Sequence, residues 1–191
     1  AVSLWPREPV GELAARRLAD ELVATIEVGD LDAAQRLAAL VLATPSAQAR
    51  ATAVQAGTEA AVRGLRAGER HSGAAVVALL ATFGEGALPA VIEALSEEEN
   101  LAVRKRLIEV VARQGAVAVA HLLPCLDDPR WYVVRNAIFI LRRLGCREML
   151  ALLKARLAGS RPQVVAEALK ALVAFQDPEW LRILQAELAG S

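Results

Sequence analysis

A repeat of 31 residues constrains the fold of this chain more than any other feature of its sequence. Stepping by 31 positions from residue 88 brings apolar residues into register four times, in three parallel rows. The rows are Leu88, Val119, Leu150 and Leu181; Val91, Leu122, Leu153 and Leu184; and Leu95, Leu126, Leu157 and Leu188. They lie at positions i, i+3 and i+7, which is the spacing of one buried helix face. Each repeat therefore predicts one helix with this face in the core.

A second helix precedes the first in each repeat. Its rows are Val76, Leu107, Ile138 and Leu169; Leu79, Val110, Leu141 and Leu172; and, in three repeats, Val103, Val134 and Val165. A glycine separates the two helices at positions 84, 115 and 145, and Asp177-Pro178 takes its place in the fourth repeat. Asp128-Pro129 and Asp177-Pro178 each predict an N-cap followed by proline in the first turn. The pattern predicts four helix pairs over roughly residues 72–190.

Residues 1–70 are predicted to be helical but do not follow the repeat. The helices are expected over residues 11–28, after the capping residue Asp30, and from Thr44-Pro45 to about Arg66. Extending the 31-residue register backwards places Gly57 and Gly64 on core rows, where a side chain is needed. We therefore predict two parts, a divergent helical N-terminal cap or subdomain over 1–70 and a repeat solenoid over 71–191.

The segment DDPRWYVVRNAIFILRRLG, residues 127–145, resembles the HEAT-repeat superfamily in its short bacterial, phycobilin-lyase-like form. The resemblance implies antiparallel helix pairs stacked into an α-α superhelix, with the second helices lining the concave face. Arg104 and Arg135 follow the valine of this pattern, but Ala166 stands there in the last repeat. The preceding aspartate is Asp127 in only one repeat, so a continuous Asp–Arg ladder between repeats is not expected.

Composition excludes several other classes. The 22 basic residues balance the 22 acidic ones, so no overall field attracts nucleic acid or an anionic membrane. The longest apolar stretches fall short of the roughly 20 residues of a membrane span. The two cysteines, Cys125 and Cys146, are expected near opposite ends of adjacent helices, beyond disulfide reach. We expect a cytoplasmic protein without a secretory signal.

No motif of enzyme chemistry is present in the sequence. The two histidines, His71 and His121, cannot build a metal site of three or four ligands. The stretch GEGAL at 84–88 lacks the Lys-Ser/Thr of a phosphate-binding loop. We predict a non-enzyme with no catalytic residues, no metal and no cofactor. Cys146 lies near a helix start but is not expected to be a functional thiol, and the acidic run 97–99 is interpreted as a solvated loop.

A binding surface is predicted on the second helices. The positions facing away from the core rows are nearly uncharged, and four of them form one row: Ala90, His121, Leu152 and Ile183. An apolar groove of this kind suits a peptide or an amphipathic helix of another protein. The alternative is that the helices are rotated and these residues belong to the core. Arg130, Trp131 and Tyr132 are not explained by the repeat and are interpreted either as packing between repeats or as a partner contact.

Residues 127–161 carry eight basic side chains against three acidic ones, a net charge of +5. Arg142, Arg143 and Arg147 are the candidate residues of a basic flank, which supports nucleic-acid binding as an alternative. Most of these arginines fall outside the inferred groove, however, and a phosphate backbone needs basic residues along its track. We therefore predict a protein–protein interaction scaffold or adaptor, within a larger bacterial protein. The less favoured alternatives are nucleic-acid binding and a lyase-like or glycosylase-like HEAT enzyme.

Overall fold

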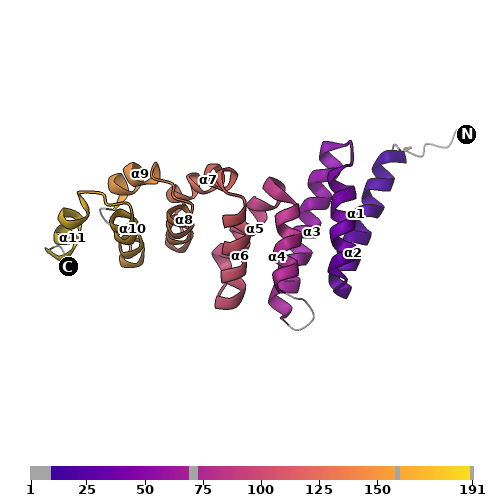
Figure 1. The fold of residues 1–191 in the computed structure, drawn as a ribbon, viewed down its shortest axis with the longest axis horizontal. Coiled ribbons are helices and arrows are strands. Elements are labelled where there is room, and N and C mark those ends of the chain that lie inside the picture. The colour runs from indigo at the N-terminus through magenta and orange to yellow at the C-terminus, as the bar shows by residue number, and fades with distance from the viewer. Residues whose placement is uncertain (1–9, 69–72, 158–159, 190–191) are drawn as a thin grey trace, which may run out of the picture. The chain divides into compact units, whose positions relative to one another are not determined.

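The computed structural model describes residues 10–68, 73–157 and 160–189, and every regular element in these ranges is a helix (Figure 1). The predicted all-α class is confirmed. The chain divides into two compact units, residues 1–114 and 115–191. Trp5 and His71 lie outside the described residues.

The first unit contains six α-helices and a short 3-10 helix among its described residues. They are α1 (Val10–Val28), α2 (Leu31–Leu42), α3 (Ala47–Ala67), α4 (Gly73–Thr82), η1 (Gly84–Ala87), α5 (Leu88–Glu97) and α6 (Leu101–Arg113). The second unit contains α7 (Ala116–Leu122), η2 (Pro124–Asp127), α8 (Trp131–Arg143), α9 (Met149–Arg156), α10 (Pro162–Ala174) and α11 (Trp180–Ala189).

The eight helices predicted from the repeat are confirmed, and they follow one another along the chain in the predicted order, as α4 and α5, α6 and α7, α8 and α9, and α10 and α11. Gly84, Gly115 and Gly145 end the first helices with φ values of 60°, 56° and 73°, where a side chain is strained. In the fourth pair Gln176 takes this left-handed conformation with φ 55°. The division between the compact units falls inside the second pair, between α6 and α7.

The predicted rows form most of the core. On the first helices Val76, Leu107 and Ile138 are fully buried, and on the second helices Val91 and Leu122 are nearly so. Leu181 differs, since 48% of its surface is exposed. The described residues contain no further helix beyond α11 that could cover it. The rows therefore locate the core correctly in the inner repeats and fail in the last one.

The second helices are shorter than the repeat predicts. Pro124 follows the end of α7 and opens η2, while η1 stands before α5, whose first turn contains Pro89. Proline has no N–H to donate to the preceding turn, so the helical hydrogen bonds of α7 stop before Pro124, although Leu123 keeps helical angles of φ −57° and ψ −45°. The interruption of α7 at Leu122 follows from this missing donor.

The N-terminal helices pack on the repeats although they lack the sequence register. Helix α2 contacts α4, and α3 contacts α5, which repeats the way α4 contacts α6. Gly57 explains the failed register, because a Cβ there would lie 2.9 Å from Cζ of Phe83 and 3.0 Å from Cδ2 of Leu22. The glycine lets α3 approach its neighbours closely where other repeats place a leucine. The predicted part boundary at residue 70 remains a prediction.

One predicted helix start in the N-terminal part is confirmed, and another lies two residues later than predicted. Asp30 caps α2 by accepting a hydrogen bond from the Ala33 N–H at 2.9 Å. Ser46 caps α3, two residues after the predicted start at Thr44, and accepts from the Ala49 N–H at 3.2 Å.

Candidate functional site

A pocket of about 360 Å³ lies in the second unit, between the start of α8, the helix α9 and the start of α10. We call it the Trp131 pocket. Its lining residues are Leu126, Asp127, Asp128, Pro129, Trp131, Val134, Leu152, Leu153, Arg156, Leu157, Ser160, Arg161 and Val164. Its volume lies in the range of small-ligand and peptide side-chain pockets. The structure therefore brings together Trp131 and Leu152, which the sequence analysis selected on separate grounds.

The start of α8 holds the aromatic side of this pocket. Asp128 does not cap α8 as predicted, because the helix begins at Trp131, with Arg130 at the N-cap position. The Asp128 carboxylate instead accepts hydrogen bonds from the Arg130 backbone N–H at 2.8 Å and from its guanidinium at 3.0 Å and 2.9 Å. These bonds from Arg130 hold the pKa of Asp128 below its usual range against the opposing effect of burial. Arg130 is thus committed to the loop that presents Trp131.

Trp131 contacts two neighbouring side chains, those of Tyr132 and Arg135. The ring of Tyr132 meets that of Trp131 edge to face, with centroids 5.8 Å apart and planes at 79°. The guanidinium of Arg135 lies 5.7 Å from the Trp131 ring centroid, which is a cation–π distance. Both aromatic rings are only half-buried. Of the three residues that the repeat left unexplained, Trp131 and Tyr132 therefore pack against each other, Arg130 binds Asp128, and Trp131 alone of the three lines the pocket.

The four residues predicted to line one groove do not lie in one pocket of the structure. Leu152 on α9 is 39% exposed and lines the Trp131 pocket, whereas His121 on α7 and Ile183 on α11 are half-buried and do not line it. Ala90 lies in the first unit, in a different pocket. A single groove through all four residues remains a prediction.

The basic flank is largely committed to internal contacts. Arg142 forms an ion pair with the buried carboxylate of Glu167 on α10 at 3.0 Å, and its guanidinium lies 5.4 Å from the Phe139 ring centroid. Arg147 donates to the Phe175 carbonyl at 2.6 Å and lies over the ring of the same residue. Arg143 is exposed, with no ion pair recorded among the described residues.

Two further basic side chains of the region also bridge neighbouring helix pairs. Nζ of Lys154 forms ion pairs with Asp177 at 3.1 Å and with Glu179 at 2.8 Å. The hydrogen bond to Glu179 has the largest effect on the pKa of Lys154, and together with the bond to Asp177 it raises that pKa. Arg156 pairs with Asp127 on the preceding helix pair. The net charge counted in the sequence therefore overstates the positive charge that this surface offers to a ligand.

A larger pocket of about 700 Å³ lies in the first unit, between α3 and α5. We call it the α3–α5 groove. Its lining residues are Ala51, Gln55, Thr58, Glu59, Val62, Arg63 and Arg66 of α3, with Gly86, Pro89, Ala90, Glu93, Ala94 and Glu97 from η1 and α5. The α3 residues follow the i, i+4, i+7 spacing of one helix face. Of these lining residues, only Ala90 was predicted from the sequence to belong to a binding surface, because α3 lies outside the repeat register.

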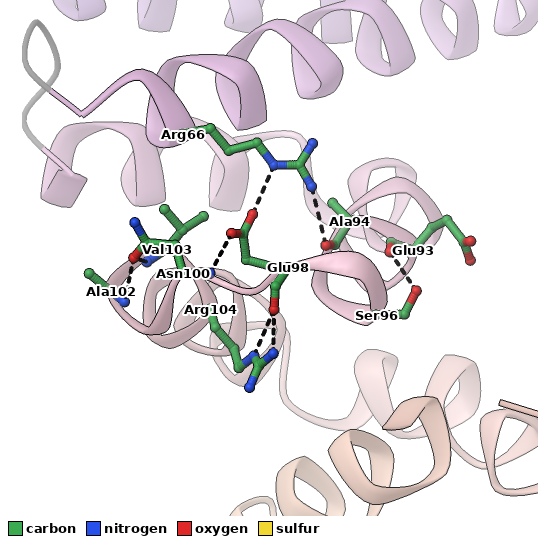
Figure 2. A network of polar contacts seen from close by, with 9 residues as sticks. All are labelled: Arg66, Glu93, Ala94, Ser96, Glu98, Asn100, Ala102, Val103 and Arg104. Carbon is green, nitrogen blue, oxygen red and sulfur yellow. Dashed lines mark hydrogen bonds and ion pairs between the residues drawn. The ribbon is translucent and has the colours of Figure 1, made fainter. Parts of the chain in front are cut away.

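One end of the groove is held by the polar network in Figure 2. Glu98 is 6% exposed, and its carboxylate accepts hydrogen bonds from Nε of Arg66 at 2.8 Å and from the Asn100 N–H at 2.9 Å. Arg104 donates to the Glu98 carbonyl, and Asn100 caps α6 through the N–H groups of residues 102 and 103. The interpretation of residues 97–99 as a solvated loop is wrong for Glu98.

The electrostatics of Glu98 follow from these bonds. Burial raises the pKa of its carboxyl, but the hydrogen bonds from Arg66 and from the Asn100 N–H, with the charges of Arg66 and Arg104, outweigh burial and lower the pKa. Glu98 is therefore ionised at neutral pH and ties α3 to the loop between α5 and α6. No sequence signal distinguished it from its two exposed neighbours, because its partner lies 32 residues away.

The described residues contain no group of three or more His, Cys, Asp and Glu side chains that could hold a metal ion. Cys146 is buried, and burial together with the Glu148 carboxylate raises the pKa of its thiol. Over the ranges described, no single helix is long and apolar enough to span a membrane, although two sharply bent helix pairs pass the same test of length and composition.

Comparison with known proteins identifies part of the chain. The sequence profile of the family described as HEAT repeats matches residues 119–190, from α7 to α11. No curated protein and no solved structure matches the chain.

Proposed function

Because residues 119–190 are HEAT repeats, we propose that this chain is a protein–protein interaction scaffold that captures a short peptide or helix of another protein. HEAT repeats are commonly interaction scaffolds and are generally non-catalytic. The observation that carries the proposal is the Trp131 pocket, where an indole and an exposed leucine meet within the repeats.

The chemistry of the pocket supports this function. Trp131 is rigidly supported by Tyr132 and Arg135, so little side-chain entropy is lost when a partner contacts it. Aromatic residues in such pockets contribute most of the binding energy in protein interfaces. Leu152 adds an exposed apolar surface on the opposite wall. A partner side chain of medium size, such as leucine or isoleucine, fits this environment.

Nucleic-acid binding is the weaker candidate. Arg142 is paired with Glu167, whereas Arg143 and Arg147 are exposed, and Arg147 already donates to the Phe175 carbonyl. A phosphate track requires several available cations in sequence. A bacterial origin, expected from the resemblance, and a cytoplasmic location, expected from the two cysteines, belong to the proposal as expectations.

The test is a selection of short peptides, displayed on phage, against the full chain. Each selected peptide is then synthesised with a fluorescent label, and its dissociation constant is measured by anisotropy. Leu152→Glu should weaken binding about ten-fold or more, because it places a charge in an apolar contact. Val117→Glu is the matched control, since Val117 is 43% exposed on α7 and does not line the pocket.

The control should bind within about two-fold of the unaltered chain, and circular dichroism should show equal helix content in both variants. The proposal fails if no peptide is selected from the library. It fails equally if the selected peptides bind Leu152→Glu as tightly as the unaltered chain.

A further inference from the structure

The α3–α5 groove has an apolar floor. Thr58 and Val62 of α3 are 0% and 5% exposed, and Ala90 and Ala94 of α5 are half-buried beside them. The Thr58 hydroxyl donates to the Val54 carbonyl at 2.7 Å, so it is satisfied within α3 and offers no free donor to the groove. The hollow exists because α5 presents alanines here, whose side chains are too short to fill the space between the two helices.

The groove is long enough for a helical segment. Its α3 wall runs from Ala51 to Arg66. At 1.5 Å per residue this wall extends about 22 Å, which equals four turns of a helix or six to seven residues of an extended chain. Arg66 closes one end, because its guanidinium reaches across to the Ala94 carbonyl at 3.5 Å (Figure 2).

The rim of the groove carries five charged residues, and they are not balanced. The two basic ones are already paired with carboxylates outside the lining, Arg63 with Glu27 at 3.1 Å and Arg66 with Glu98 at 2.8 Å. The three acidic rim residues are Glu59, Glu93 and Glu97.

The acidic residues lie on both walls and are exposed. Glu59 accepts a hydrogen bond from the neutral amide of Gln55 at 3.2 Å, which leaves its charge in place. Glu93 has a contact of its own. With Arg63 and Arg66 also assigned to their partners, Glu59 on α3 and Glu97 on α5 leave two negative charges on opposite walls around an apolar floor.

We propose that the α3–α5 groove binds a basic amphipathic segment of a partner protein, with small or medium apolar side chains on the floor and lysine or arginine against Glu59 and Glu97. This inference shares with the proposed function the premise that the chain binds a polypeptide, but it concerns a separate site in the other compact unit.

Other classes of ligand fit the groove less well. The carboxylates of Glu59 and Glu97 repel phosphates, which disfavours a nucleic-acid backbone and an anionic lipid headgroup. They are distributed along two walls, and the described residues hold no acidic cluster that could bind a metal ion. A polypeptide with alternating apolar and basic positions satisfies both the floor and the rim.

The experiment uses the full chain and two synthetic helical peptides of about 16 residues, matched to the wall of the groove. Both carry alanine and leucine on one face, and they differ only in having lysine or glutamate on the flanks. Binding is followed by fluorescence anisotropy at low and at physiological salt. The lysine peptide should bind at least about ten-fold more tightly, and added salt should weaken it, because the rim charges are exposed.

The site is tested by the double charge reversal Glu59→Lys with Glu97→Lys. This change should weaken the lysine peptide about ten-fold, since each exposed carboxylate contributes a factor of about two to five. The matched control reverses Glu99 and Glu109, which are exposed in the same unit but outside the groove. A third variant, Ala90→Trp, fills the floor and should weaken both peptides.

Each outcome decides the inference. It is overturned if the two peptides bind equally, or if the control pair weakens binding as much as the groove pair. It is also overturned if binding of the lysine peptide depends on Leu152→Glu instead of on the groove variants. In that case the Trp131 pocket, and with it the proposed function, still stands. If phage-selected peptides depend on neither site, the proposed function fails independently.

Discussion

The ion pair between Arg66 and Glu98 is expected to stabilise the first unit far more than an exposed pair of equal length. Replacing Arg66 by methionine keeps most of the side-chain volume and removes the charge and the donors. The Glu98 carboxylate then remains 6% exposed, with the Asn100 N–H as its one remaining hydrogen-bond donor among the contacts described. Nothing else in the loop replaces the bond from Nε of Arg66 at 2.8 Å.

The magnitude follows from burial. Removing one partner of a fully buried ion pair costs about 3–5 kcal/mol, because a charge is left without compensation. Arg66 is 44% exposed on its side chain, so water screens roughly half of this interaction, and we expect a loss of about 2 kcal/mol in the free energy of unfolding. For a chain of this size such a loss lowers the melting temperature by about 4–8 °C.

Arg113 and Glu109 on α6 provide the control. Their N–O distance is also 2.8 Å, but both side chains are about half exposed, at 49% and 48%. Arg113→Met should therefore cost less than about 0.5 kcal/mol. Urea unfolding followed by circular dichroism measures both variants, and a double-mutant cycle with Glu98→Gln isolates the coupling energy. The reasoning is refuted if the two arginine variants lose equal stability, because burial would then not decide the strength of the pair.

The same pair predicts a pH dependence. The pKa of Glu98 is lowered in the folded chain, so its stabilising contribution is fully present above the unfolded value of about 4.3. That contribution is lost as the pH falls from about 4.3 through the lower folded pKa. Glu98→Gln cannot titrate, and its stability should fall less steeply over this acidic range than that of the unaltered chain. Parallel curves would contradict the assignment.

Three further changes test other parts of the structure. Gly57→Ala should destabilise the chain by about 1 kcal/mol in urea, since overpacking against two buried side chains outweighs the gain in helix propensity, and increased stability would contradict the close approach. Arg142→Met should cost about 1–2 kcal/mol because Glu167 stays buried, whereas the exposed Arg143→Met should cost almost nothing; equal losses would refute the structural role of the first arginine. Cys146 should react with iodoacetamide about ten-fold more slowly in the folded chain than in urea, because burial raises its pKa, and equal rates would contradict this.

The sequence predicts the repeated part of the fold well because apolar periodicity and helix-ending glycines are local signals. The eight helices of the repeats and the buried rows through Val76, Leu107 and Ile138 follow from spacing alone. The packing of α2 and α3 on the repeats was not predicted. It depends on Gly57. In the sequence, a glycine on a core row indicates an interruption of the repeat, and only the structure shows that Phe83 packs against it.

The candidate sites were only partly predictable. Trp131 was selected because the repeat did not explain it, and Leu152 because it faces away from the core rows. Their meeting in one pocket depends on where α9 lies against the start of α8, which no periodicity determines. The α3 wall of the other groove was missed altogether, since Ala51, Thr58 and Val62 carry no unusual residue type.

Charge was the least predictable property, because polar partners come from the adjacent helix pair. Arg142 and Glu167 are 25 residues apart, and Arg66 and Glu98 are 32 apart, so a count over consecutive residues records one member of a pair without the other. The segment 127–161 therefore looks basic although much of its charge is neutralised internally. By the same reasoning, the residues lining the α3–α5 groove count as three acidic against two basic side chains, a net charge of −1, yet Glu59 and Glu97 keep two negative charges once Arg63, Arg66 and Glu93 are assigned to their contacts. The surface that a partner meets is the charge remaining after these contacts, and for the first unit this reasoning favours a basic partner.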